Sequence, residues 1–238
     1  MRVLSITHER DAGPGVFADA IAAAGGELEQ WFRAETGAPP ADPAAYDAVM
    51  TFGGSMHVDQ QQEHGWIADE ISLLRELLER GTPLLGVCLG AQLLSEAAGG
   101  DARPLREPEI GWFEVEVTAA GAQDPLLGPL APRFEAFEWH SYECGLPAHA
   151  TALARTPVCA QAFRVGETAW GIQFHAEVSV ADVEHWIDEY REDGDRAGVD
   201  PEALRAQTLP RMAAWNDLGR ELCGRFLAAV ARPVGTRT

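Results

Sequence analysis

The hydrophobic and polar positions of the first hundred residues alternate between two patterns. Residues 2–7, 47–52 and 83–87 are apolar runs with the length of a buried strand. Residues 14–24 and 66–80 instead carry apolar side chains at three- or four-residue steps, which is typical of an amphipathic helix. Because strand and helix alternate, the pattern predicts a doubly wound α/β fold with a mostly parallel central sheet and flanking helices.

The pattern changes after about residue 110. Shorter segments there are rich in β-branched and aromatic residues, which favour strands. They predict additional, antiparallel strands at residues 111–117, 134–139, 158–165 and 168–174.

Residues 181–232 predict a helical C-terminal extension. Asp200 and Pro201 suit an N-cap and a first helical turn, and Pro210 is expected to kink or divide the helix. An apolar stripe follows at helical spacing: Met212, Trp215, Leu222 and Phe226. Because no linker-like or low-complexity tract divides the 238 residues, we expect a single domain in which residues 1–180 form the core.

Composition narrows the range of partners. The formal net charge of −19 repels phosphate backbones and anionic lipids, so we expect neither a nucleic-acid nor a membrane partner. All 18 basic residues are Arg, which excludes lysine nucleophiles and Schiff bases. Residues 1–7 are too short and mixed for a signal peptide, no apolar stretch is long enough to span a membrane, and the four cysteines have no C-x-x-C spacing. These features predict a soluble cytoplasmic protein with reduced thiols.

Residues 86–92, Gly-Val-Cys-Leu-Gly-Ala-Gln, follow a predicted buried strand and begin a predicted helix. This arrangement is typical of a nucleophile elbow with Cys88 in place of serine. The helix N-terminus favours the thiolate, and the N–H of Leu89 can face an oxyanion, so we expect an exposed, activated Cys88. A lone cysteine in an apolar run is more often an inert core thiol, but the small residues at this junction favour the nucleophile.

Two further segments accompany the elbow. His175 and Glu177 end an apolar strand two residues apart, so the strand period places both on one face, where Glu177 could orient a His175 base. Gly53 and Gly54 follow another predicted strand, and the Gly54 N–H is the second candidate oxyanion donor. Taken alone, each segment is equally compatible with a solvated strand end or an ordinary turn.

Together these three segments resemble the class I glutamine amidotransferases, in the family's order, over residues 1 to about 180. The glutaminase domain of GMP synthetase and stand-alone relatives, including γ-glutamyl peptidases, are most similar. The resemblance implies that the Cys88 thiolate attacks the glutamine side-chain amide, that His175 and Glu177 complete the triad, and that ammonia leaves a γ-glutamyl thioester. It also implies the Gly54 and Leu89 oxyanion donors and a set of substrate contacts: Gly53, Gln92, His140, Ser141 and Tyr142.

The sequence departs from the family pattern at a few points. Ser55 replaces the proline common after the glycine pair, and Ala176 replaces the proline common between the histidine and the glutamate. No ATP-pyrophosphatase signature follows Glu177, so synthetase activity would require a separate acceptor-activating subunit.

Three functions therefore remain open: glutamine amidotransfer with such a subunit, stand-alone hydrolysis of γ-glutamyl compounds, and non-catalytic regulation on the same fold. We expect no cofactor and no metal, because His57, Asp59 and His64 lack a recognised ligand spacing. The remaining cysteines and histidines receive no role: Cys144, Cys159, Cys223, His8, His149 and His185. The C-terminal extension either adds to the core or covers the place where a synthetase would dock.

Overall fold

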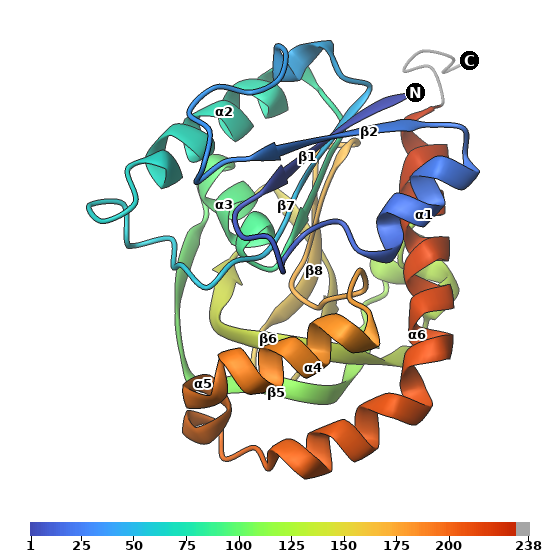
Figure 1. Ribbon diagram of the computed structural model, residues 1–238. Coiled ribbons are helices and arrows are strands. Elements are labelled where there is room, and N and C mark those ends of the chain that lie inside the picture. The colour runs from blue at the N-terminus through green and yellow to red at the C-terminus, as the bar shows by residue number, and fades with distance from the viewer. Residues whose placement is uncertain (232–238) are drawn as a thin grey trace.

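The computed structural model describes residues 1–231, which form one nine-stranded mixed sheet flanked by helices (Figure 1). The last residue of the expected extension, 232, lies outside this range. The strands are β1 (Arg2–Thr7), β2 (Glu27–Phe32), β3 (Ala48–Thr51), β4 (Leu84–Val87), β5 (Asp101–Val117), β6 (Arg133–Gly145), β7 (Ala150–Arg155), β8 (Ala160–Val165) and β9 (Ala169–Ile172). The helices are α1 (Val16–Ala23), α2 (Trp66–Arg80), α3 (Leu89–Ala97), α4 (Val180–Glu189), α5 (Arg191–Arg196) and α6 (Pro201–Val230), with short 3₁₀ turns at Pro43–Ala45, Gly121–Gln123 and Gly128–Leu130.

The sheet has a parallel half and an antiparallel half. Its order is β2-β1-β3-β4-β9-β8-β7-β5-β6; the pairs from β2 to β9 are parallel and those from β9 to β6 antiparallel. The predicted α/β fold with added antiparallel strands is therefore confirmed. Segment 168–174 differs from its prediction, because β9 is antiparallel only to β8 and runs parallel to β4. The two strands end side by side, and the Cys88 N–H donates to the Ile172 carbonyl at 2.9 Å.

Side chains of the parallel strands alternate between two cores, as buried strands require. Val3 and Met50 face the core that α1 and α6 cover, whereas Leu4 and Val49 face the core under α2 and α3. Figure 1 shows these helix pairs on opposite sides of the sheet. This double winding leaves the carboxyl ends of the parallel strands as the place where a site can form.

The C-terminal extension is built into the same core. Asp200 caps α6 by accepting a hydrogen bond from the Glu202 N–H at 3.0 Å, and Pro201 occupies the first turn, as predicted. The stripe residues are buried together with α1: Met212, Trp215, Leu222 and Phe226. Pro210 lies inside one continuous helix, which bends along the molecule in Figure 1, so the proline does not divide it.

Two strands are longer than predicted, and two others were not predicted. β5 begins at Asp101 and β6 continues to Gly145, forming a long ribbon that the sequence pattern showed only in part. β2 and β7 were not predicted. Within residues 1–231, no helix combines the length and the apolar character that crossing a bilayer requires.

Candidate active site

Cys88 lies at the sharp turn between β4 and α3, at the carboxyl end of its strand. Its backbone has φ 52° and ψ −112°, and it is the one non-glycine residue with positive φ among residues 1–231. Glycines permit this turn. A Cβ at Gly86 would lie 2.5 Å from the Gly90 carbonyl oxygen, and one at Gly90 would lie 2.1 Å from the Thr51 carbonyl oxygen. Such local strain is typical of a nucleophile held at a strand-to-helix turn.

The Cys88 side chain is less accessible than the sequence predicted. Only 7% of the residue is exposed, because β6 passes over it and the thiol lies 3.8 Å from the Trp139 carbonyl oxygen. The sulfur nevertheless lines a cavity, which also contains Leu89 and Gly54. Neither of these N–H groups donates a hydrogen bond within the described residues, so both remain available to a ligand.

His175 and Glu177 form a buried pair next to Cys88. His175 Nδ1 lies 2.7 Å from Glu177 Oε1. The imidazole of His175 and the side chain of Cys88 both approach Gly53. A Cβ built on Gly53 would lie 3.2 Å from His175 Cε1 and 3.7 Å from Cys88 Cβ. Burial disfavours a charged imidazole, but Coulombic interactions with Glu177 and Cys88 outweigh it and raise the pKa of His175 well above its usual value.

The main chain around His175 is fixed by α6. The Trp215 indole N–H donates to the His175 carbonyl at 2.8 Å, and the Asn216 side-chain amide donates to the Val178 carbonyl at 2.7 Å. On the opposite side, the first residue of α1, Val16, donates its N–H to the Glu177 carbonyl at 2.8 Å. The orientation of the imidazole therefore depends on helices from both ends of the described chain.

The glycine loop is supported from β1 and α2. His8 Nδ1 donates to the Gly53 carbonyl at 3.0 Å, while His8 Nε2 lies 3.1 Å from a Glu70 carboxylate oxygen. Burial lowers the pKa of His8, but the attraction of Glu70 outweighs it and the pKa is raised. Ser55 donates both its N–H and its hydroxyl to Glu9, each at 2.7 Å. A proline at position 55 could not make the first of these bonds.

Most of the site residues predicted from the sequence line this cavity. Its lining includes Gly54, Cys88, Leu89, Gln92, His140, Ser141, Tyr142 and His175. Gly53 and Glu177 lie behind this wall. Gln92 directs its amide nitrogen inward, 3.3 Å from both the Tyr142 carbonyl and Gln173 Oε1. The Tyr142 hydroxyl donates to Asp59 at 2.9 Å, and burial followed by this bond raises the pKa of Tyr142 to about 12.

Other lining residues were missed by the sequence analysis. Met56 and Ile110 add apolar surface, and α4, α5 and the residue between them contribute four side chains: Trp186, Tyr190, Asp193 and Arg196. His57, which lacks a recognised ligand spacing in the sequence, stacks on Tyr142 at 4.2 Å between ring centroids. No motif marks these positions, because they reach the cavity through tertiary packing.

A second buried polar cluster adjoins the cavity wall at His140. Its Nε2 lies 3.3 Å from Glu109 and 3.4 Å from Glu138. Burial lowers the pKa of His140, but these two carboxylates outweigh it and raise the pKa to about 10. The cluster thus favours positive charge at Nε2.

Comparisons with known proteins agree with this geometry. The sequence model of the family described as glutamine amidotransferase class-I matches residues 24–187. A glutamine amidotransferase-like protein of Salmonella typhimurium is 29% identical over 222 residues, which are 91% of each chain. A glutamine-hydrolyzing GMP synthase subunit of Ignicoccus hospitalis is 33% identical over 59% of this chain and 71% of its own length.

Two further proteins extend the comparison. A gamma-glutamyl-L-1-hydroxyisopropylamide hydrolase of a Pseudomonas species is 32% identical over 157 residues, and the match spans 59% of this chain and about half of that protein, 52%. A glutamine amidotransferase of Thermotoga maritima superposes with a TM-score of 0.86 at 26% identity, covering 95% of this chain and 98% of its own. The family resemblance inferred from the motifs is therefore confirmed, and the chain belongs to the class-I glutamine amidotransferase family.

Proposed function

We propose that the chain is a cysteine hydrolase that releases ammonia from the side-chain amide of glutamine through a γ-glutamyl thioester. One observation carries this proposal: Cys88 is held at positive φ in a cavity beside the buried His175–Glu177 pair, whose side chains are 2.7 Å apart. A nucleophile, a base and a group that orients the base are the components of a hydrolytic triad.

The proposed reaction has two stages. The Cys88 thiolate attacks the amide carbon, and the N–H groups of Leu89 and Gly54 donate to the oxyanion. His175 transfers its proton to the departing nitrogen, so the C–N bond breaks and ammonia leaves. Water then attacks the thioester while His175 accepts a proton, and glutamate departs as the C–S bond breaks and Cys88 is regenerated. Glu177 keeps the imidazole in the required orientation throughout.

We assign substrate binding to the residues that surround the thiol: Gly53, Gln92, His140, Ser141 and Tyr142. Four of them line the cavity, and Gly53 lies next to both Cys88 and His175, which supports the assignment.

A thiol comparison tests the proposal. Cys88→Ala should abolish ammonia release from glutamine, whereas Cys144→Ala should retain it. Cys144 is a suitable control because it is also buried and donates to Gln173 Oε1 at 3.3 Å. Ammonia is measured with purified protein in a coupled assay, alone and with cell extract. Undiminished hydrolysis by Cys88→Ala would rule out the mechanism.

A second function uses the same chemistry on γ-glutamyl amides without a synthetase partner. The observation that favours it is the position of Tyr190, Asp193 and Arg196, which bring α4 and α5 to the cavity. We infer that these polar side chains contact the amine portion of a γ-glutamyl amide. The Pseudomonas relative that is named as a γ-glutamyl amide hydrolase supports this alternative.

The two functions differ in what extract should do. A stand-alone hydrolase should turn over a γ-glutamyl anilide faster than glutamine, and its rate should not respond to added extract. An amidotransferase subunit should gain glutaminase activity when extract supplies its acceptor-activating partner. We also propose that residues 181–231 belong to the one catalytic domain, because α6 fixes the His175 peptide.

A further inference from the structure

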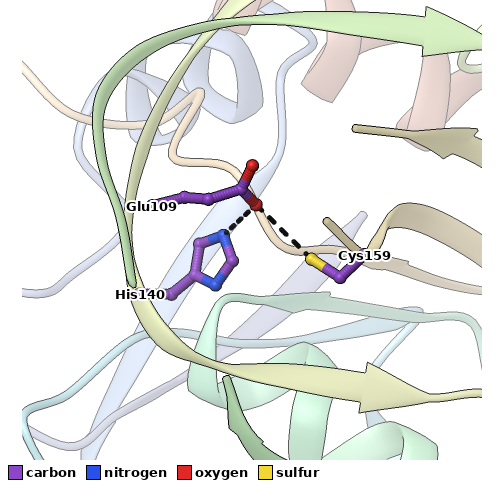
Figure 2. A group of neighbouring side chains, drawn as sticks. All are labelled: Glu109, His140 and Cys159. Carbon is purple, nitrogen blue, oxygen red and sulfur yellow. Dashed lines mark hydrogen bonds and ion pairs between the residues drawn. The ribbon is translucent and has the colours of Figure 1, made fainter. Parts of the chain in front are cut away.

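The buried cluster next to the cavity joins strands that are far apart in the sequence. Glu109 of β5 pairs in register with His140 of β6, and Glu138 precedes His140 by two residues on the same face. Cys159 lies next to this pair, immediately before β8. Figure 2 shows the side chains of Glu109, His140 and Cys159 pointing toward one another. The four residues are 0–7% exposed.

We propose that Glu109, His140 Nε2 and Cys159 Sγ form a zinc site, with Glu138 as a neighbouring carboxylate 3.4 Å from Nε2. The candidate ligand atoms of Glu109, His140 and Cys159 all lie within 4.8 Å of one another. A sulfur, an imidazole nitrogen and carboxylate oxygens form a donor set that suits Zn²⁺ in tetrahedral geometry. This proposal departs from the expectation from sequence that the chain holds no metal.

The separations at Glu109 match two edges of a zinc tetrahedron. Zinc bond lengths of about 2.0 Å to nitrogen and oxygen and about 2.3 Å to sulfur imply edges of about 3.3 Å between nitrogen and oxygen and about 3.5 Å between sulfur and oxygen. His140 Nε2 lies 3.3 Å from Glu109 and 3.4 Å from Glu138. Cys159 Sγ lies 3.5 Å from Glu109 Oε2. The two separations that meet at Glu109 Oε2 therefore already have the length that one zinc ion requires, and Cys159 Sγ lies within 4.8 Å of His140 Nε2.

The tautomer of His140 leaves its other nitrogen free to act as a ligand. His140 Nδ1 lies 2.9 Å from the Tyr142 carbonyl oxygen, which can only accept, so Nδ1 carries the hydrogen. An N–H bonded to a backbone carbonyl is the usual support for a metal-binding histidine. A metal ion would displace the proton from Nε2, whose lone pair then faces the two carboxylates.

Several buried atoms in the cluster lack hydrogen-bond partners: His140 Nε2, Glu109 Oε1 and both carboxylate oxygens of Glu138. A proton on Nε2 would not satisfy them, because neither carboxylate lies in hydrogen-bonding geometry from that nitrogen. No arginine in residues 1–231 is ion-paired with Glu109 or Glu138. His140 is the one cation that pairs with these two buried carboxylates within residues 1–231, and a divalent ion would balance the remaining negative charge.

The ion would act on the cavity wall and not on the reacting thiol. It would link β5, β6 and the start of β8 immediately behind His140 and Ser141, which line the cavity. Metal content can therefore be tested independently of hydrolysis, and a failure of the proposed function would leave this inference intact.

The experiment measures bound metal in the native protein. The chain is expressed in minimal medium supplemented with Zn²⁺, dialysed and analysed for metal, and a parallel preparation replaces Zn²⁺ with Co²⁺. We expect one ion per chain, and for Co²⁺ the visible bands of a tetrahedral site with a thiolate charge-transfer band in the near ultraviolet. A native protein that retains neither ion in stoichiometric amount would overturn the proposal.

Near-isosteric variants locate the ion. Cys159→Ser should lose the charge-transfer band, and Cys159→Ser and Glu138→Gln should each retain less metal by about tenfold or more. The matched controls, Cys144→Ser and Cys88→Ala, should retain both ion and band, because they alter thiols outside the cluster. Loss of the band in Cys88→Ala with its retention in Cys159→Ser would place the metal on the cavity thiol and refute the site.

Discussion

The contact between α6 and the segment that carries His175 leads to a sharp prediction about a single methyl group. Gly219 faces that segment, and a Cβ built there would lie 2.0 Å from the Ala176 carbonyl oxygen. Gly219→Ala should therefore destabilise the protein and impair catalysis. Gly224, five residues later in α6, has no heavy atom within 4 Å of the place where its Cβ would lie, so Gly224→Ala provides a matched control.

The magnitude follows from the distances. Relief of the contact requires a displacement of about 1.4 Å, because ordinary carbon contacts begin near 3.4 Å, and such overpacking costs about 1–3 kcal/mol. The same displacement would break the 2.8 Å bond from Trp215 to the His175 carbonyl, and a buried unsatisfied carbonyl costs about 1–3 kcal/mol more. Alanine returns about 1 kcal/mol of helix propensity. The expected net loss is about 1–5 kcal/mol of the free energy of unfolding.

Urea unfolding and glutaminase kinetics measure the two effects. Gly219→Ala should lose stability by this amount and, because a shift of about 1 Å at a catalytic group can cost about 100-fold in rate, should lose kcat/KM on that scale. Gly224→Ala should gain about 1 kcal/mol and keep its activity. If both variants gained stability and kept their kinetics, α6 would not hold the His175 segment.

Other predictions follow from the buried charges and from α6. Glu177→Gln should lower the pKa of His175, so the imidazolium is lost earlier and the alkaline limb of the pH–rate profile moves to lower pH; an unmoved limb would contradict the pairing. The raised pKa of His8 means that its pairing with Glu70 stabilises the fold fully below pH 6.5 and that this contribution fades as pH rises through the folded-state pKa. Urea unfolding across that range should show this decline in the parent protein and not in Glu70→Gln. Truncation after residue 196 removes a four-residue apolar stripe worth about 6–12 kcal/mol, so circular dichroism should report an unfolded chain, and a folded, active one would refute the integral role of α6.

The parts of the fold that could be predicted are those with strong one-dimensional patterns. β1, β3 and β4 are apolar runs buried on both faces, and α2 carries a regular apolar stripe. β2 was missed because it lies at the sheet edge and is only partly buried, so polar residues interrupt its pattern. The predicted length of β5 was too short for the same reason, since the first part of this strand is largely exposed.

The residues of the site also differ in how far the sequence could predict them. Cys88, His175 and Glu177 could be selected because their local spacing carries chemical meaning within one turn or one strand end. Cys159 could not, because its relation to Glu109 exists only through the pairing of β5 with β6 and the return of β8. The same holds for Arg196, which reaches the cavity through the packing of α5 and has no motif of its own.

The hydrogen bond from α6 to the His175 carbonyl also has a consequence for biosynthesis. The ribosome makes the nucleophile segment first, the base segment next and α6 last among the described elements. Because the bond from Trp215 supports the base, a nascent chain that has already displayed Cys88 still lacks a positioned imidazole. Under the proposed mechanism, His175 is therefore positioned only after the final helix has emerged, and unfinished chains would carry the thiol without a working proton donor.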